Sequence, residues 1–116
     1  MELVALLSTG QGTWGQVAGL IKQGEWENII LIGTEFAEKF TVDKKHDFIR
    51  INSNAPIREI RDDLIKKLKD KIKGTEVLLS IASGSGKEHM AIISALLNTP
   101  VGVRFVALTK DGIIEF

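Results

Sequence analysis

Short, continuously apolar segments alternate along this chain with segments of helical periodicity, and this alternation constrains the fold most. The apolar runs cover residues 2–8, 29–32, 48–51, 77–81, 101–108 and 113–116. Strands that are covered by helices on both faces have this composition, because neither side of the strand meets water. The turn Asp111-Gly112 separates the last two runs and predicts a hairpin there.

The segments between these runs carry apolar residues at helical spacing. The clearest helix is expected over about residues 56–73, and its apolar stripe consists of Ile57, Ile60, Leu64, Leu68 and Ile72. Further helices are expected from Trp14 to just before Gly24, over about 35–40, and over about 88–97. Strands that alternate with helices predict an α/β fold. We expect a single Rossmann-like domain over residues 1–116, with a mostly parallel central sheet, helices on both faces and a C-terminal antiparallel hairpin.

Two local signals at helix ends can be read from the same pattern. Gly24 is expected to end the first helix in a left-handed conformation, which glycine adopts without strain. Asn54 is expected to cap the helix over 56–73, and Pro56 is tolerated in its first turn.

Composition excludes several classes of protein. The chain has 116 residues, 15 basic and 15 acidic side chains, no cysteine and two histidines. Without cysteine there is no disulfide, thiol nucleophile or thiolate metal site, and we expect no metal and no cofactor. Zero net charge argues against a general duplex-DNA binder. No apolar run approaches the ~20 residues that span a bilayer, and no basic segment precedes the first run, so a cytoplasmic protein without membrane contact is expected.

The first of two glycine-rich loops runs from Ser8 to Gly15. It contains the pattern G-x-G-x-x-G directly after a strand and at the start of a helix, which is the context of a dinucleotide-binding loop. Glu35 follows the second strand, where such a site needs an acidic partner for the ribose. The chain holds little more than one mononucleotide-binding half, however, and Trp14 is bulky for a close phosphate approach. The alternative is a tight turn that simply requires glycine.

The second loop is the segment 83–87, Ser-Gly-Ser-Gly-Lys. It is not a Walker A motif, because Ile81 stands where a glycine is needed and Glu88 where a hydroxyl is needed. Free N–H groups at a helix N-terminus, two hydroxyls and an ammonium nevertheless make an anion site. Lys87 opposes the helix dipole, and a bound anion would remove that conflict. Alternatively Lys87 is solvated and Glu88 suits the dipole, while His89 either faces the ligand or lies on the surface.

Both loops are expected at one place in the fold. In sheets of this kind, ligands bind beyond the carboxyl ends of strands, where the strand order reverses. In the usual order, the strands over 2–8 and 77–81 are neighbours. The two loops would then flank a single crevice.

The helix over about 88–97 is apolar almost all round, which a surface helix should not be. One side meets the sheet, and the other side needs a cover. The economical cover is a second copy of the chain, which predicts a homodimer. The alternative is burial beneath the C-terminal hairpin. The lysine-rich end of the 56–73 helix is expected to be a solvated face, with nucleic-acid binding as the minority interpretation.

The order of these elements and loops resembles that of a known protein family. A first strand ends in Ser8-Thr9-Gly10, a fourth runs into residues 84–87, and an alanine-containing apolar helix and a strand follow before the Asp111-Gly112 turn. This order is similar to that of the CRISPR-associated Rossmann fold (CARF) domains, over nearly the whole chain. The resemblance implies a homodimeric sensor of cyclic oligoadenylates in antiviral defence, which binds the ring across the dimer two-fold through these two loops.

We expect no effector segment beyond the Rossmann-like unit, and the resemblance is then to stand-alone members such as ring nucleases. Such an enzyme needs no metal: a ribose 2′-OH attacks the adjacent phosphate and leaves a 2′,3′-cyclic phosphate. Lys87 would neutralise the transition-state charge, Ser8 or Thr9 would position the reacting group, and His89 is an outside candidate for acid–base help. Whether the chain cleaves the ring or only binds it stays open. The expected ligand-binding residues are Gly10, Gln11, Gly12, Thr13, Thr34, Ser83, Gly84, Ser85, Gly86 and His89.

Two other classes remain. One is a binder of another nucleotide or dinucleotide through the G-x-G-x-x-G loop. The other is a non-enzymatic sensor or interaction subunit, whose loops hold no ligand in the extreme case.

Overall fold

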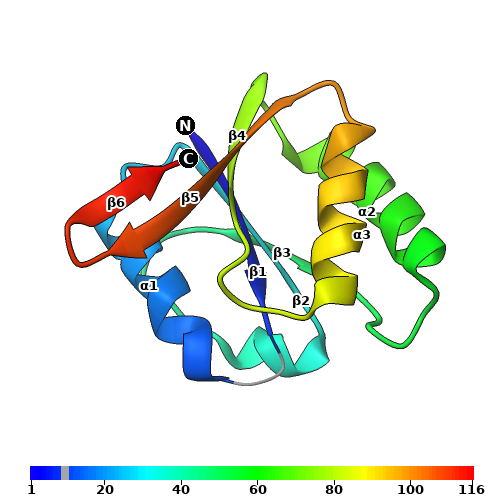
Figure 1. The fold of residues 1–116 in the computed structure, drawn as a ribbon, viewed down its shortest axis with the longest axis horizontal. Coiled ribbons are helices and arrows are strands. Elements are labelled where there is room, and N and C mark those ends of the chain that lie inside the picture. The colour runs from blue at the N-terminus through cyan, green and yellow to red at the C-terminus, as the bar shows by residue number, and fades with distance from the viewer. Residues whose placement is uncertain (9–10) are drawn as a thin grey trace.

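A six-stranded sheet with the order β3-β2-β1-β4-β5-β6 forms the centre of the molecule. The computed structural model describes residues 1–8 and 11–116. Neighbouring strands are parallel from β3 to β5, and β6 runs antiparallel to β5 at the edge (Figure 1). The strands are β1 (Glu2–Leu7), β2 (Asn28–Gly33), β3 (Asp47–Arg50), β4 (Glu76–Ser80), β5 (Gly102–Thr109) and β6 (Gly112–Glu115). The predicted α/β fold with a mostly parallel sheet and a C-terminal hairpin is confirmed.

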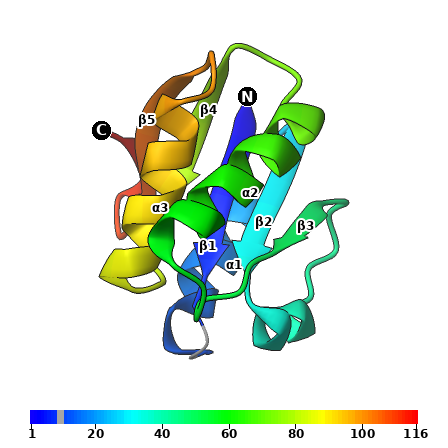
Figure 2. The same cartoon turned by 90° about the vertical axis from the view of Figure 1, so that its right-hand side faces the viewer.

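Helices cover both faces of this sheet. The α-helices are α1 (Trp14–Gln23), α2 (Ile57–Lys71) and α3 (Gly86–Leu97), and the short 3₁₀ helices are η1 (Gln11–Thr13) and η2 (Glu35–Lys39). Figure 2 shows α2 and α3 side by side in front of the sheet, with α1 behind it. Each face therefore has its own apolar core.

Strand β1 explains why the apolar runs are continuous. Every apolar side chain from Leu3 to Leu7 is fully buried. Val4 and Leu6 pack into the core beneath α2 and α3, whereas Leu3, Ala5 and Leu7 pack into the core beneath α1. Side chains of a strand alternate between faces, so two covered faces require apolar residues at every position.

Two predictions of helix ends are wrong. Gly24 follows α1 with extended backbone, φ −87° and ψ 161°, and the Trp26 ring occupies the space that a Cβ would need. Glycine is therefore required there because the Trp26 ring packs against it, and not because the backbone is left-handed. Pro56, and not Asn54, precedes the first turn of α2, and no side chain caps it. The Asn54 N–H instead donates to Asn52 Oδ1 at 3.0 Å, which shapes the preceding turn.

Helix α3 is buried on one side only. Ala91, Ile92, Ala95 and Leu96 are fully buried, but Met90 is 61% and Leu97 76% exposed. The C-terminal hairpin does not cover these two side chains, so that alternative is wrong.

Candidate functional site at the carboxyl edge of the sheet

The two glycine-rich loops meet, as the sequence predicts. Strands β1 and β4 are parallel neighbours, with Ala5 opposite Ser80, and the strand order reverses between them. The Ser8 N–H donates to Ser83 Oγ at 2.7 Å, although the two residues are 75 positions apart in the chain. This bond joins the loop after β1 to the loop after β4 at the point where ligands bind in such sheets. Thr9 and Gly10 lie outside the described residues, as does the side chain of Gln11.

Trp14 binds the first loop through a hydrogen bond to its backbone. Its indole Nε1–H donates to the Ser8 carbonyl oxygen at 3.1 Å. Its ring lies 5.7 Å from the ring centres of both Phe36 and Phe40, which follow β2 in and just after η2. Trp14, the bulky residue of the glycine motif, therefore packs against the apolar core between α1 and the sheet. Thr13 stands immediately before α1 without capping it through its side chain.

In the second loop, α3 begins with a capping box. Ser85 Oγ accepts from the Glu88 N–H at 3.2 Å, and Glu88 Oε1 accepts from the Ser85 N–H at 2.8 Å. The Glu88 side chain is buried. The capping box therefore already uses the Ser85 and Glu88 N–H groups at this helix N-terminus, where the sequence predicted a bound anion. An incoming phosphate must find its donors elsewhere in the two loops.

Lys87 and His89 are both bonded to backbone carbonyls of neighbouring loops. The Lys87 ammonium donates to the Ser53 carbonyl oxygen at 2.9 Å and so reaches the loop between β3 and α2. Lys87 is therefore half-buried rather than fully solvated, whereas the other half of that alternative agrees with the structure, because Glu88 lies in the capping box at the helix N-terminus. His89 Nε2 lies 2.9 Å from the Ser83 carbonyl oxygen, which requires a proton on that nitrogen. His89 thus braces the second loop, and it is not simply a surface histidine.

Sequence reasoning missed the loop that receives Lys87. Its three consecutive polar residues, Asn52, Ser53 and Asn54, end the third strand at the same edge of the sheet. Only Asn54 of these three has a predicted role, as a helix cap. A polar run after a parallel strand is a site signal in its own right, because all carboxyl ends of parallel strands meet at one edge.

The glycines at this edge are of two kinds: at one position the fold itself requires glycine, and at three others a Cβ would meet no neighbouring atom. Gly84 has φ +106°, and the Leu6 side chain occupies the place of a Cβ, so the fold itself requires glycine there. Gly12, Gly15 and Gly86 have neither constraint, since a Cβ at each would meet nothing within 4 Å. Their backbone is open on the outer side, which suits close approach by a ligand.

Two buried hydroxyls lie at the same edge. Thr34 Oγ1 after β2 and Ser80 Oγ at the end of β4 have no hydrogen-bond partner among the described residues. Ser80 is fully buried, and Thr34 is half-buried. Buried hydroxyls are normally paired, so these two mark the carboxyl edge as a place with unused hydrogen-bonding capacity.

Within residues 1–8 and 11–116, no group of three or more His, Asp or Glu side chains has an arrangement that could hold a metal ion. In the same part of the chain, no helix has the length and apolar character to cross a membrane. Comparison of the chain with protein-family models and with curated proteins finds no match. The arrangement itself offers backbone N–H groups, hydroxyls and one lysine, which can bind a phosphate-containing ligand.

Proposed function

We propose that this chain binds a cyclic oligoadenylate across the two-fold axis of a homodimer, as a cytoplasmic component of antiviral defence. The observation that carries the proposal is the hydrogen bond from the Ser8 N–H to Ser83 Oγ. It unites the loops after β1 and β4, which are the two loops that the resemblance to CARF domains assigns to the ligand. The open backbone at Gly12 and Gly86 supports the same assignment.

An uncovered apolar surface supports the homodimer. We call it the α3–hairpin surface, and it combines the outer side of α3 with the exposed apolar side chains of β5, β6 and the residue that follows. Its exposed members are Met90, Leu97, Phe105, Ile114 and Phe116. Exposed apolar patches of this kind mark association sites, and a two-fold homodimer is the commonest assembly. Leu97→Glu should then convert a dimer to a monomer in sedimentation analysis.

Binding is the part of the proposal that the geometry supports best. For cleavage, the Lys87 ammonium would have to leave the Ser53 carbonyl oxygen and turn to the phosphate. The 2′-OH would attack the adjacent phosphorus, the bond to the 5′-oxygen would break, and that oxygen would take up the proton. Lys87 would stabilise the charge that develops on the phosphate oxygens.

The test is incubation of the protein with cyclic tetra- and hexa-adenylate in EDTA, followed by chromatography and by equilibrium binding. A retained intact ring supports a sensor, and linear products with a 2′,3′-cyclic phosphate support a ring nuclease. Gly86→Val should abolish binding while the protein stays folded, since the Cβ at this position meets no other atom. A protein that neither binds nor cleaves either ring would refute the proposal.

A dinucleotide is the second candidate ligand, because Gly12 and Gly15 of the G-x-G-x-x-G loop are both open. It predicts cofactor absorbance that copurifies with the protein. Thermal stabilisation by a nicotinamide or flavin dinucleotide, and not by the cyclic ring, would favour it, because a ligand that prefers the folded state raises stability.

A further inference from the structure

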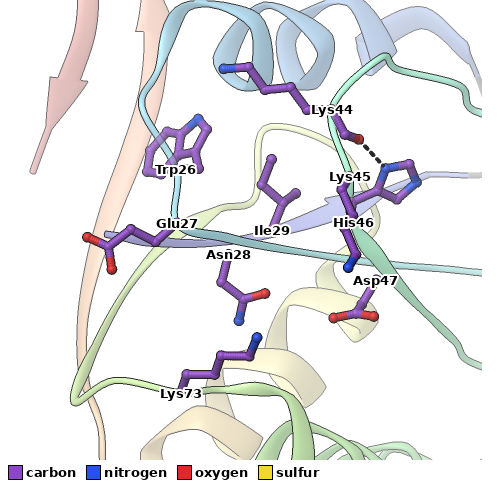
Figure 3. Close-up of a pocket in the computed structure, with 9 residues that line it drawn as sticks. All are labelled: Trp26, Glu27, Asn28, Ile29, Lys44, Lys45, His46, Asp47 and Lys73. Carbon is purple, nitrogen blue, oxygen red and sulfur yellow. Dashed lines mark hydrogen bonds between the residues drawn. The ribbon is translucent and has the colours of Figure 1, made fainter.

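The opposite edge of the sheet holds a pocket that the proposed function does not use. It lies where β2 and β3 begin and has a volume of about 500 Å³. Pockets for small molecules measure roughly 300–1,000 Å³. Figure 3 shows the lining side chains, which are Trp26, Glu27, Asn28, Ile29, Lys44, Lys45, His46, Asp47 and Lys73. We call this cavity the amino-edge pocket.

A buried carboxylate next to the amino-edge pocket fixes two of its lining residues, Asn28 and Lys73. Glu2 is 5% exposed and accepts hydrogen bonds from the Lys73 N–H at 2.7 Å and the Gly74 N–H at 2.6 Å. The Asn28 amide donates both to Glu2, at 2.8 Å, and to the Lys71 carbonyl oxygen, at 2.8 Å. These bonds fix the Asn28 side chain. Because its two amide hydrogens are used, Asn28 can offer a ligand only its oxygen.

The charge of each acidic group near the pocket is offset by a neighbouring group. Glu27 turns away from the cavity in Figure 3 and lies 3.1 Å from the amino-terminal ammonium. Asp47 lies 3.8 Å from the Lys71 ammonium, which offsets its charge and leaves its oxygens able to accept hydrogen bonds. The charge of Glu2 is compensated by its hydrogen bonds from Asn28, Lys73 and Gly74.

The basic groups retain unused donors. Within the described part of the chain, neither Lys45 nor Lys73 has a carboxylate within 4.0 Å of its ammonium. In Figure 3 the Lys73 side chain points toward Asn28 and that of Lys45 toward Asp47, so the two ammonium groups enter from opposite sides. Lys44 is turned outward, where it donates to the Gly24 carbonyl oxygen at 2.8 Å. The pocket therefore carries an excess of positive charge together with fixed acceptors.

We propose that the amino-edge pocket binds the phosphate monoester of a small hydroxylated molecule, of mononucleotide or sugar-phosphate size. Lys45 and Lys73 donate to the phosphate oxygens through charge-assisted hydrogen bonds. Asn28 Oδ1 and the Asp47 carboxylate accept from the hydroxyl groups. His46 Nδ1 lies 3.0 Å from the Lys44 carbonyl oxygen, and its ring turns away from the other lining side chains in Figure 3, so we assign it no contact with the ligand.

The chain supplies its own reporters for a test by NMR. Trp26 lines the amino-edge pocket, and its Nε1–H donates to the Leu20 carbonyl oxygen. Trp14 lies at the carboxyl edge and donates to Ser8. The probes are adenosine 5′-monophosphate, adenosine and inorganic phosphate, each titrated into the ¹⁵N-labelled full chain.

Adenosine 5′-monophosphate should shift the Trp26 indole signal saturably and leave the Trp14 signal in place. Adenosine should shift neither, and inorganic phosphate should bind more weakly than the monoester. The double variant Lys45→Ala, Lys73→Ala should bind roughly tenfold to a hundredfold more weakly, because each charge-assisted bond lost is worth about a factor of ten. The matched control, Lys66→Ala with Lys69→Ala on exposed positions of α2, removes the same charge and should bind normally.

Three results would overturn the proposal: no shift of Trp26 at millimolar monoester, an equal loss in the control variant, or binding of an RNA oligonucleotide without binding of the monoester. Failure of the carboxyl-edge proposal is distinguishable, because cyclic oligoadenylate should move the Trp14 signal instead.

Discussion

The two edges of the central sheet use their polar groups in opposite ways. At the carboxyl edge, Ser83, Lys87 and His89 are bonded to the loops after β1, β3 and β4, so that three loops are tied together. At the amino edge, a buried carboxylate, Glu2, binds the backbone of Lys73 and Gly74 and the Asn28 side chain, while the ammonium groups of Lys45 and Lys73 keep their donors within the described part of the chain. A buried anion can therefore lie next to a lysine-lined pocket, provided that backbone N–H groups compensate that anion.

Glu2→Gln should have the largest effect, because it removes an acceptor that binds two backbone N–H groups and the Asn28 amide. An amide has one acceptor oxygen, so at least one buried donor loses its partner. The expected loss is about 3 kcal/mol of the free energy of unfolding, measured by denaturant titration. Glu27→Gln is the matched control. Its side chain is 86% exposed and should change the free energy of unfolding by less than about 0.5 kcal/mol.

The same carboxylate makes stability depend on pH. Burial would raise the pKa of Glu2, but the hydrogen bonds from the Lys73 N–H, Asn28 and the Gly74 N–H, with the amino-terminal charge, hold the pKa below its ordinary value of 4.5. A lowered pKa in the folded state means that the contribution is complete above pH 4.5 and is lost as the pH falls further. Between pH 7 and pH 3, the free energy of unfolding should change less with pH for Glu2→Gln than for the natural chain. An equal pH dependence of the free energy of unfolding in the two proteins would contradict this role of Glu2.

Ser83→Ala tests the carboxyl edge and should have an intermediate effect. It leaves the part-buried Ser8 N–H without its 2.7 Å acceptor, at a cost of about 1–2 kcal/mol. It should also weaken binding of cyclic oligoadenylate, because the two loops are no longer tied. Ser94→Ala, in the middle of α3, is the control and should be neutral or slightly stabilising. Unchanged ligand affinity in Ser83→Ala would separate this bond from binding.

Lys87→Ala and Lys45→Ala compare one lysine from each edge of the sheet, and they should change the free energy of unfolding least. Lys87 has a backbone partner at 2.9 Å, whereas Lys45 has no carboxylate partner within 4.0 Å in the described part of the chain. Lys87→Ala should lower the free energy of unfolding by about 0.5–1 kcal/mol, and Lys45→Ala by nearly nothing. Thermal unfolding of the two variants at equal ionic strength compares them directly. The opposite order would show that the Ser53 contact contributes no stability.

Much of the fold was predictable because its signals are local. The apolar runs placed all six strands to within one or two residues, and the stripe from Ile57 to Ile72 placed α2. The meeting of the two loops was predictable too, since it follows from strand order alone. The ends of helices were less so. Gly24 was assigned to a left-handed turn because the sequence does not show that the Trp26 ring packs against it.

The sequence by itself determined the α/β architecture, the two glycine loops and their place at the carboxyl edge, because periodicity is a local property and sheets of this kind share a usual strand order. The tertiary structure decided where the polar side chains are used. Lys87 reaches Ser53, 34 positions away, and Glu2 reaches Lys73 and Gly74, 71 and 72 positions away. Such pairings depend on which loops the sheet brings together in space, and a one-dimensional pattern carries no record of that distance. The amino-edge pocket exists for the same reason, because its residues come from three separate segments of the chain.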